Sequence, residues 1–173
     1  GARRPGRCCA DASRHGSGKS TLARLIADAV PPAPGAVVLR SDQLRKARFG
    51  AAETERLPAE AYASEVSVAV YREMESRAEA LLRQGVSVIA DATFTHGESR
   101  TRIEAVAARA GVPFDGLWLE APERDLTARV TARRADASDA DAAVVRRQLA
   151  TGAAKGDLRD AVLRMLGVEA ASR

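Results

Sequence analysis

Gly16-Ser17-Gly18-Lys19-Ser20-Thr21 is the stretch that decides the fold of this chain. Its glycines lack a Cβ atom, so the backbone N–H groups can turn toward a single anion, and Lys19 adds a positive charge for the outer phosphates of a nucleotide. Ser20 supplies a hydroxyl of the kind that binds Mg²⁺. Apolar residues follow at helical spacing, so we expect a helix whose N-terminal end faces the phosphates. The stretch therefore predicts a nucleotide-binding loop made of Gly16, Ser17, Gly18, Lys19, Ser20 and Thr21.

The chain that leads into this loop departs from the usual pattern. The full motif is G-x-x-x-x-G-K-[ST], and its first position is occupied by Ser13. A residue with a Cβ atom takes the tight turn at a cost of about 1–2 kcal/mol, so we expect ATP affinity below that of related loops. Residues 1–12 hold at best three apolar residues in a row, where a buried parallel strand is normally found. We expect residues 1–12 to be an aberrant or poorly ordered segment.

The composition is that of an ordinary globular chain. At 173 residues, one domain over residues 1–173 is the simplest expectation. The net charge of +4 comes from scattered basic and acidic residues, so the charge pattern does not indicate a nucleic-acid partner. Cys8 and Cys9 are adjacent, which excludes an ordinary disulfide framework or a spaced zinc site. No long apolar run or signal-peptide pattern is present, so we expect no membrane partner and a cytoplasmic location.

Short apolar runs alternate with helical patterns along the chain. They predict strands at 36–39, 86–90 and 114–119, and helices at 42–48, 59–84 and 95–110. Thr95 and Glu98 have the spacing of a capping box at the start of the last of these helices. The alternation predicts a three-layer α/β/α fold around a parallel sheet, in which the first and last strands have the weakest support.

Two carboxylates follow predicted strands. Asp42 comes after the strand at 36–39, and Asp91 comes after the strand at 86–90. Ligands of a parallel sheet bind beyond the carboxyl ends of the strands, so the phosphate loop, Asp42 and Asp91 should meet in one crevice. Carboxylates placed there can accept a proton or bind Mg²⁺. The plainer interpretations are that Ser41 or Asp42 caps a short helix and that Asp91 is a turn residue.

Four features, taken in order, resemble the P-loop kinases of the predicted-kinase, zeta-toxin and polynucleotide-kinase type. They are the loop at 16–21, the turn at 41–45, the strand end at 91–94 and three arginines between residues 129 and 134. The resemblance covers about residues 16–150. It is closest to small ATP-binding kinase domains that, in relatives, are fused to aminoglycoside-phosphotransferase-like domains. It implies the fold of a P-loop NTPase, with ATP and Mg²⁺ as cofactors.

The resemblance also implies roles at the crevice. Asp42 would be the general base that accepts the proton of the attacking hydroxyl, and Arg45 would hold the acceptor. Ser20 and Asp91 would bind Mg²⁺, and Thr93 would contact the acceptor. The alternative for Arg45 is a solvated position on a helix.

A lid over residues 129–140 is implied as well. Its arginines would neutralise charge on the transferred phosphoryl group, with Arg129 at the nucleotide, Arg133 in catalysis and Arg134 at the acceptor. A solvated basic helix face is the alternative for these three residues.

These features predict an ATP-dependent kinase that transfers the γ-phosphoryl group to a hydroxyl of a small molecule, such as a sugar or nucleotide-sugar. A 5′-hydroxyl nucleic-acid kinase is the alternative enzyme. A catalytically weak nucleotide-binding module is the alternative of a different class. A GTPase is disfavoured because the sequence has no N-K-x-D segment to recognise guanine.

Overall fold

The computed structural model describes residues 6–12, 19–118 and 167. Its strands are β1 (Cys8–Ala12), β2 (Val37–Arg40), β3 (Val88–Ala92) and β4 (Phe114–Trp118). Its α-helices are α1 (Lys19–Ile26), α2 (Ser41–Arg48), α3 (Ser64–Arg83) and α4 (Gly97–Ala110). Two short 3₁₀ helices are η1 (Ala27–Ala29) and η2 (Ala59–Tyr62).

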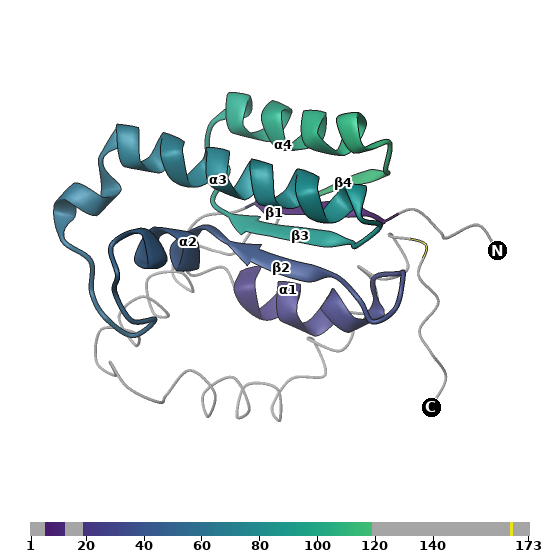
Figure 1. The fold of residues 1–173 in the computed structure, drawn as a ribbon, viewed down its shortest axis with the longest axis horizontal. Helices are drawn as coiled ribbons and strands as arrows, with labels where there is room; N and C mark the ends of the chain where they lie inside the picture. Colours follow the sequence, from purple (N-terminus) through teal and green to yellow (C-terminus); the bar gives the residue numbers. More distant parts are fainter. Residues whose placement is uncertain (1–5, 13–18, 119–166, 168–173) are drawn as a thin grey trace.

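The four strands form one sheet in the order β2-β3-β1-β4, and every neighbouring pair is parallel. Helices cover both faces of this sheet, with α3 and α4 on one side and α1 on the other (Figure 1). A parallel sheet needs such crossover helices because each strand must return to the same edge before the next begins. The predicted α/β/α architecture with a parallel sheet is confirmed.

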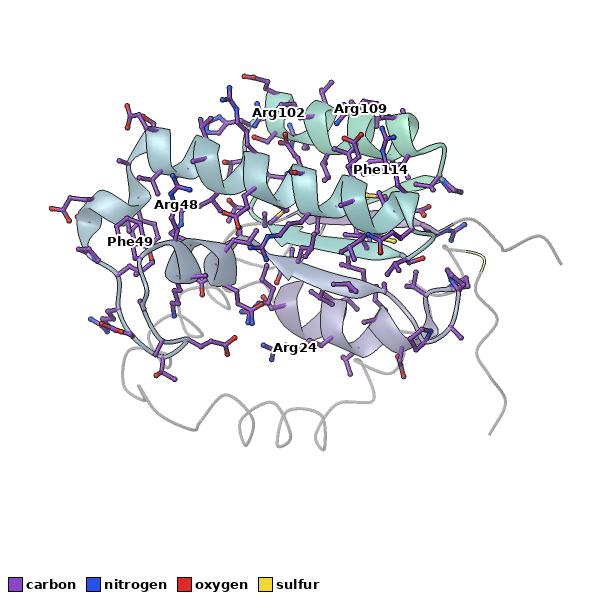
Figure 2. All side chains as sticks on the ribbon, viewed as in Figure 1. Arg24, Arg48, Phe49, Arg102, Arg109 and Phe114 are labelled. Carbon is purple, nitrogen blue, oxygen red and sulfur yellow. The ribbon has the colours of Figure 1, made fainter. Side chains whose placement is uncertain are left out.

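Ion pairs join α3 to α4, the two helices that cover one face of the sheet. Arg102 Nε lies 2.9 Å from Glu75 Oε1, and Arg109 Nη2 lies 2.8 Å from Glu79 Oε2. Figure 2 shows both arginines on α4, beside α3. Glu79 also pairs with Arg83 at 2.7 Å, one turn along α3. The hydrogen bonds from Arg109 and Arg83 hold the pKa of Glu79 below its ordinary value of 4.5.

Replacing Glu79 with glutamine tests this link. A lowered pKa in the folded state means that the ionised carboxylate stabilises the fold above pH 4.5, and that this stability disappears as the pH falls through the lowered pKa. We expect E79Q to lower Tm slightly at pH 7 and to match the wild type in strong acid. Thermal unfolding followed by circular dichroism measures both. Glu73→Gln is the matched control, because the ion pair of Glu73 among the described residues is with Arg77, within α3. Equal curves for E79Q and the wild type at pH 7 would contradict the prediction.

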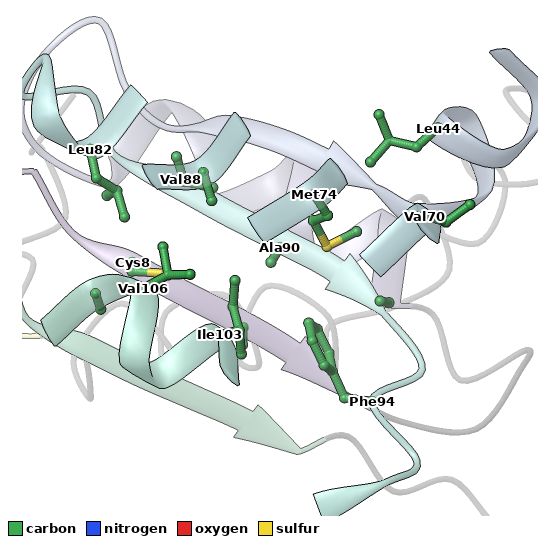
Figure 3. Packing of buried hydrophobic residues seen from close by; sticks show 14 residues of the cluster. Cys8, Leu44, Val70, Met74, Leu82, Val88, Ala90, Phe94, Ile103 and Val106 are labelled. Atoms are coloured by element: carbon green, nitrogen blue, oxygen red, sulfur yellow. The ribbon is translucent and has the colours of Figure 1, made fainter. Parts of the chain in front are cut away.

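The core lies in two clusters, one on each face of the sheet. One contains Leu44 of α2, inward residues of α3 and α4, and Phe94 just after β3 (Figure 3). The other packs α1 and Val30 against Cys9, Ile89 and Leu117. Successive residues of a strand point to opposite faces, and the clusters follow that rule, with Val88 and Ala90 in the first and Ile89 in the second.

β1 corrects the expectation that residues 1–12 are poorly ordered. Residues 8–12 form a central strand between β3 and β4, while residues 1–5 lie outside the described part of the chain. Cys8 and Cys9 are fully buried, so thiols take the place of the expected Val and Ile side chains. Burial raises the pKa of both thiols from 9.0 to about 12.

Contacts at the start of β1 hold the strand in register. The backbone N–H of Arg7 donates to Ser87 Oγ at 2.8 Å, and the Ser87 hydroxyl donates to the carbonyl of Pro31. A Cβ atom on Gly6 would lie 2.9 Å from the carbonyl oxygen of Val86, so only glycine allows this close approach. Long-range contacts therefore supply what the local sequence of β1 lacks.

Two expected caps are wrong. The N-cap of α2 is Arg40, and the N-cap of α4 is His96; neither makes a capping hydrogen bond through its side chain. Asp42 lies inside the first turn of α2, and Glu98 pairs with Arg102 at 2.8 Å instead of capping α4. A carboxylate in the first turn still stabilises a helix through its dipole, so local spacing alone did not separate the two arrangements.

Candidate functional site

The carboxyl ends of three strands bring the candidate residues to one edge of the sheet. Arg40 of β2 and Asp11 of β1 are both paired in register with Asp91 of β3. The chain leaves this row toward α2 from β2, toward α1 from β1, and toward Thr93 from β3. The predicted convergence of the three strand ends is therefore found in the topology.

The described part of the phosphate loop begins with Lys19, the first residue of α1. Gly16, Ser17 and Gly18 lie outside the described residues, as do the side chains of Lys19 and Thr21. Ser20 is half-buried in the first turn of α1. The helix expected after the loop is present, and it packs against β1, β2 and β3.

Asp91 is the buried carboxylate of this edge. It lies inside β3, one residue before the strand ends, and its side chain is only 5% exposed. Arg40 Nε lies 3.4 Å from Asp91 Oδ2, yet this buried nitrogen has no hydrogen-bond partner among the described residues. The strand alternation puts Asp91 on the α1 face of the sheet, the face from which Ser20 comes. Asp91 therefore belongs to the strand and not to a turn, and its role in binding Mg²⁺ stays a prediction.

Asp42 is the exposed carboxylate of the same edge. It is the second residue of α2, and half of its side chain (51%) is exposed. Within the described part of the chain its ion pair is with Lys46, one turn further on, at 3.7 Å. The carboxylate end of this long pair is half exposed, so the pair constrains the Asp42 side chain little and leaves it accessible to a ligand in solvent.

Arg45 is held from several sides. The residue is 8% exposed, which contradicts the solvated alternative. Its Nη1 donates to the carbonyl of Ala61, its Nη2 lies 3.3 Å from Ser67 Oγ, and its guanidinium stacks 5.0 Å from the centre of the Tyr62 ring. These contacts tie α2 to η2 and α3, and they fix the guanidinium at the edge of the α2–α3 layer.

Thr93 follows β3 directly and is half-buried. Its Oγ1 lies 3.2 Å from the hydroxyl of Tyr71 on α3. The hydroxyl of Tyr71 also accepts a hydrogen bond of 3.2 Å from the backbone N–H of Phe94. Thr93 therefore has a fixed place two residues beyond Asp91.

The predicted lid, residues 129–140 with Arg129, Arg133 and Arg134, lies outside the described residues. The last strand of the predicted sheet would follow residue 149, and that region also lies outside the described residues, apart from residue 167.

A family model of an AAA domain matches residues 14–154. The match covers most of the chain and includes the phosphate loop, both carboxylates and the predicted lid. The chain belongs to this family. This match supports the resemblance to P-loop kinases independently of the four sequence features described above.

Three solved structures that share this fold are named as kinases. A candidate kinase from Chloroflexus aurantiacus has a TM-score of 0.64 and 19% identity, and the match covers 84% of this chain and 76% of the other. The APS kinase of Mycobacterium tuberculosis, solved with AMPPNP and APS, has a TM-score of 0.60 and 24% identity, covering 79% of each chain. A sugar kinase from Janibacter sp. HTCC2649 has a TM-score of 0.61 and 19% identity, covering 95% and 96%. This AAA domain therefore has the fold of a P-loop kinase.

No curated protein matches this AAA domain. Within the described residues, no helix combines the length and the apolar character needed to cross a bilayer.

Two residues at this edge were not predicted from the sequence. Arg40 directly follows the predicted strand at 36–39, and Tyr71 lies within the predicted helix at 59–84. Arg40 could have been found from its position directly before Ser41, because the parallel register of β2 and β3 sets Arg40 beside Asp91. No local pattern points to Tyr71, because its partners lie 22 and 23 residues away in the chain.

Proposed function

We propose that this AAA domain is an ATP-dependent phosphotransferase that moves the γ-phosphoryl group to a hydroxyl of a small molecule. The observation that carries this proposal is the common edge where the start of α1, the exposed carboxylate of Asp42 and the buried carboxylate of Asp91 meet. Phosphoryl transfer requires a bound nucleotide, charge neutralisation and a base beside the nucleophile, and these elements supply the three.

In the proposed reaction, the acceptor oxygen attacks the γ-phosphorus of ATP. The bond from that phosphorus to the bridging oxygen breaks, and ADP leaves. The carboxylate of Asp42 takes the proton of the attacking hydroxyl, and its exposure suits a group that must reach a diffusing acceptor. The Gly16–Thr21 loop and Lys19 hold the phosphates, while Arg45 and Thr93 hold the acceptor.

Ser20 and Asp91 fit a magnesium site. In the proposed site the protein supplies these two oxygen ligands; the described ranges hold no group of three His, Cys, Asp or Glu residues arranged as a metal site. Mg²⁺ prefers such hard oxygen donors and usually keeps phosphate and water ligands besides. Arg40 Nε balances the charge of Asp91 at 3.4 Å and makes no hydrogen bond among the described residues. Bound there, Mg²⁺ would neutralise charge on the phosphates.

The lid completes the proposal. We place residues 129–140 over the phosphates, with Arg129 at the nucleotide, Arg133 at the transferred group and Arg134 at the acceptor. Arginine suits this task because its guanidinium binds phosphate oxygens in a fixed fork. We further propose that residues 1–173 act as one domain.

A small-molecule acceptor has the better support. Two of the similar structures are named for small molecules, an APS kinase and a sugar kinase, and the sugar kinase matches over nearly its whole length. A nucleic-acid acceptor is the second candidate, since a Pnkp1/Rnl/Hen1 RNA repair complex is also similar, with a TM-score of 0.60, although this chain covers only 44% of that chain.

An acceptor screen with ATP labelled at the γ-phosphate tests the proposal. The panel contains sugars, nucleotide-sugars, APS and a 5′-hydroxyl oligonucleotide, each with Mg²⁺. We expect label on a small molecule, with Lys19→Ala as the blank. Label on the oligonucleotide, lost steeply with added salt, would favour the nucleic-acid kinase. ATP binding without transfer to any acceptor would favour a nucleotide-binding module.

A further inference from the structure

The exit of β3 has a strained backbone. Phe94 has a φ of +40°, a value that side chains other than glycine rarely adopt, and it is the one such residue in the described part of the chain. Its ring is 1% exposed and packs into the cluster with Ile103 (Figure 3). Strain of this kind persists only where surrounding contacts hold it, and it gathers at binding and catalytic sites.

Tyr71 provides the contacts that hold this turn. Its hydroxyl accepts from the N–H of Phe94 at 3.2 Å and lies 3.2 Å from Thr93 Oγ1. Its ring meets the Phe94 ring edge to face, with centroids 5.5 Å apart and an interplanar angle of 79°. One side chain of α3 thus binds both residues that follow β3.

The proton on Tyr71 decides which way Thr93 is oriented. Either hydroxyl can donate in the hydrogen bond between Tyr71 and Thr93. A phenol is the stronger donor, so we take Tyr71 to donate to Thr93 Oγ1, which leaves the proton of the Thr93 hydroxyl for a third partner. Thr93 is half-buried at the edge where Asp91 lies, where a bound ligand can be that partner.

We propose that Tyr71 is a positioning residue of this site, which holds the Thr93–Phe94 turn so that the Thr93 hydroxyl donates to the phosphoryl acceptor. This role rests on the proposed function. It assigns Tyr71 to acceptor recognition and not to nucleotide binding, because its contacts end on the two residues after β3.

Tyr71→Phe is the test, because it keeps the ring contact and removes only the hydroxyl. Loss of hydrogen bonds of this kind should lower kcat/KM for the acceptor about three- to ten-fold, mostly through KM, and leave the Kd for ATP within about two-fold. Hydrogen exchange of the Phe94 amide should become faster. Thr93→Val should cause a similar loss of kcat/KM. The double variant should be no worse than Thr93→Val, because Tyr71 acts on the acceptor through the Thr93 hydroxyl. Thr101→Val is the matched control, since the hydroxyl of Thr101 donates to the carbonyl of Gly97 within α4 and contacts neither Tyr71 nor Thr93 among the described hydrogen bonds.

Different outcomes separate this proposal from the proposed function. Unchanged Phe94 exchange in Tyr71→Phe would overturn the contact itself. Faster exchange with unchanged acceptor KM, or additive losses in the double variant, would overturn the positioning role. A wild-type chain that phosphorylates no acceptor would refute the proposed function and the acceptor role of Thr93, while faster exchange would still establish that Tyr71 holds the turn.

Discussion

Replacing Lys19 with alanine should abolish phosphoryl transfer and weaken ATP binding. Lys19 is the first residue of α1, at the point where the phosphate loop enters the helix. In the proposed site its ammonium group neutralises charge on the outer phosphates, and the loss of one such stabilising group should lower turnover by at least about a hundred-fold. Calorimetry with ATP and the transfer assay measure the two effects separately.

Arg77→Ala is the matched control for Lys19→Ala. It also removes one positive charge, but from an exposed position on α3 where, in the described part of the chain, the side chain pairs with Glu73. Transfer should remain close to that of the wild type. If Lys19→Ala kept both its ATP affinity and its turnover, the assignment of the phosphate loop would be wrong.

Asp42→Asn should separate chemistry from binding. Asparagine has nearly the same size but cannot accept the proton of the acceptor hydroxyl. We expect ATP affinity to remain near that of the wild type and transfer to fall by about two to four orders of magnitude, the range for a positioned general base. Because the ion pair between Asp42 and Lys46 is 3.7 Å long and Asp42 is half exposed, Tm should change little.

Glu73→Gln serves as the control for Asp42→Asn, since it neutralises another carboxylate on the surface of a helix. Transfer by Asp42→Asn within a few-fold of the wild type would show that Asp42 only stabilises the first turn of α2. The base would then be another residue.

Much of the fold could be predicted because its signals are local. The apolar runs of β2 and β4 were located within one residue, and Gly111 ends α4 in the left-handed conformation that favours glycine. β1 was missed for the opposite reason. Its side chains are small, and its place in the sheet depends on β3, β4 and Ser87, which are distant in the chain.

In the candidate site, too, the residues with a local signal could be predicted and those that depend on distant contacts could not. Asp42 and Asp91 could be found because each stands where a predicted strand ends. The burial of Arg45 could not be predicted, because its contacts are with Ala61 and Tyr62 of η2 and with Ser67 of α3. Arg40 and Tyr71 also act through partners on other elements, and spacing along one strand or helix carries no information about such partners.

The cysteines of β1 allow the opening of this central strand to be followed by thiol labelling. The thiolate is the form that reacts with alkylating reagents, and a pKa near 12 leaves almost none of it at neutral pH while the strand is in place. Modification of Cys8 and Cys9, the only cysteines of the chain, must therefore wait until the sheet opens. The rate of labelling then measures how often β1 leaves the sheet. Because β1 leads into the phosphate loop, any nucleotide that stabilises the folded chain should slow this rate, so the thiols offer a binding assay that needs no knowledge of the acceptor.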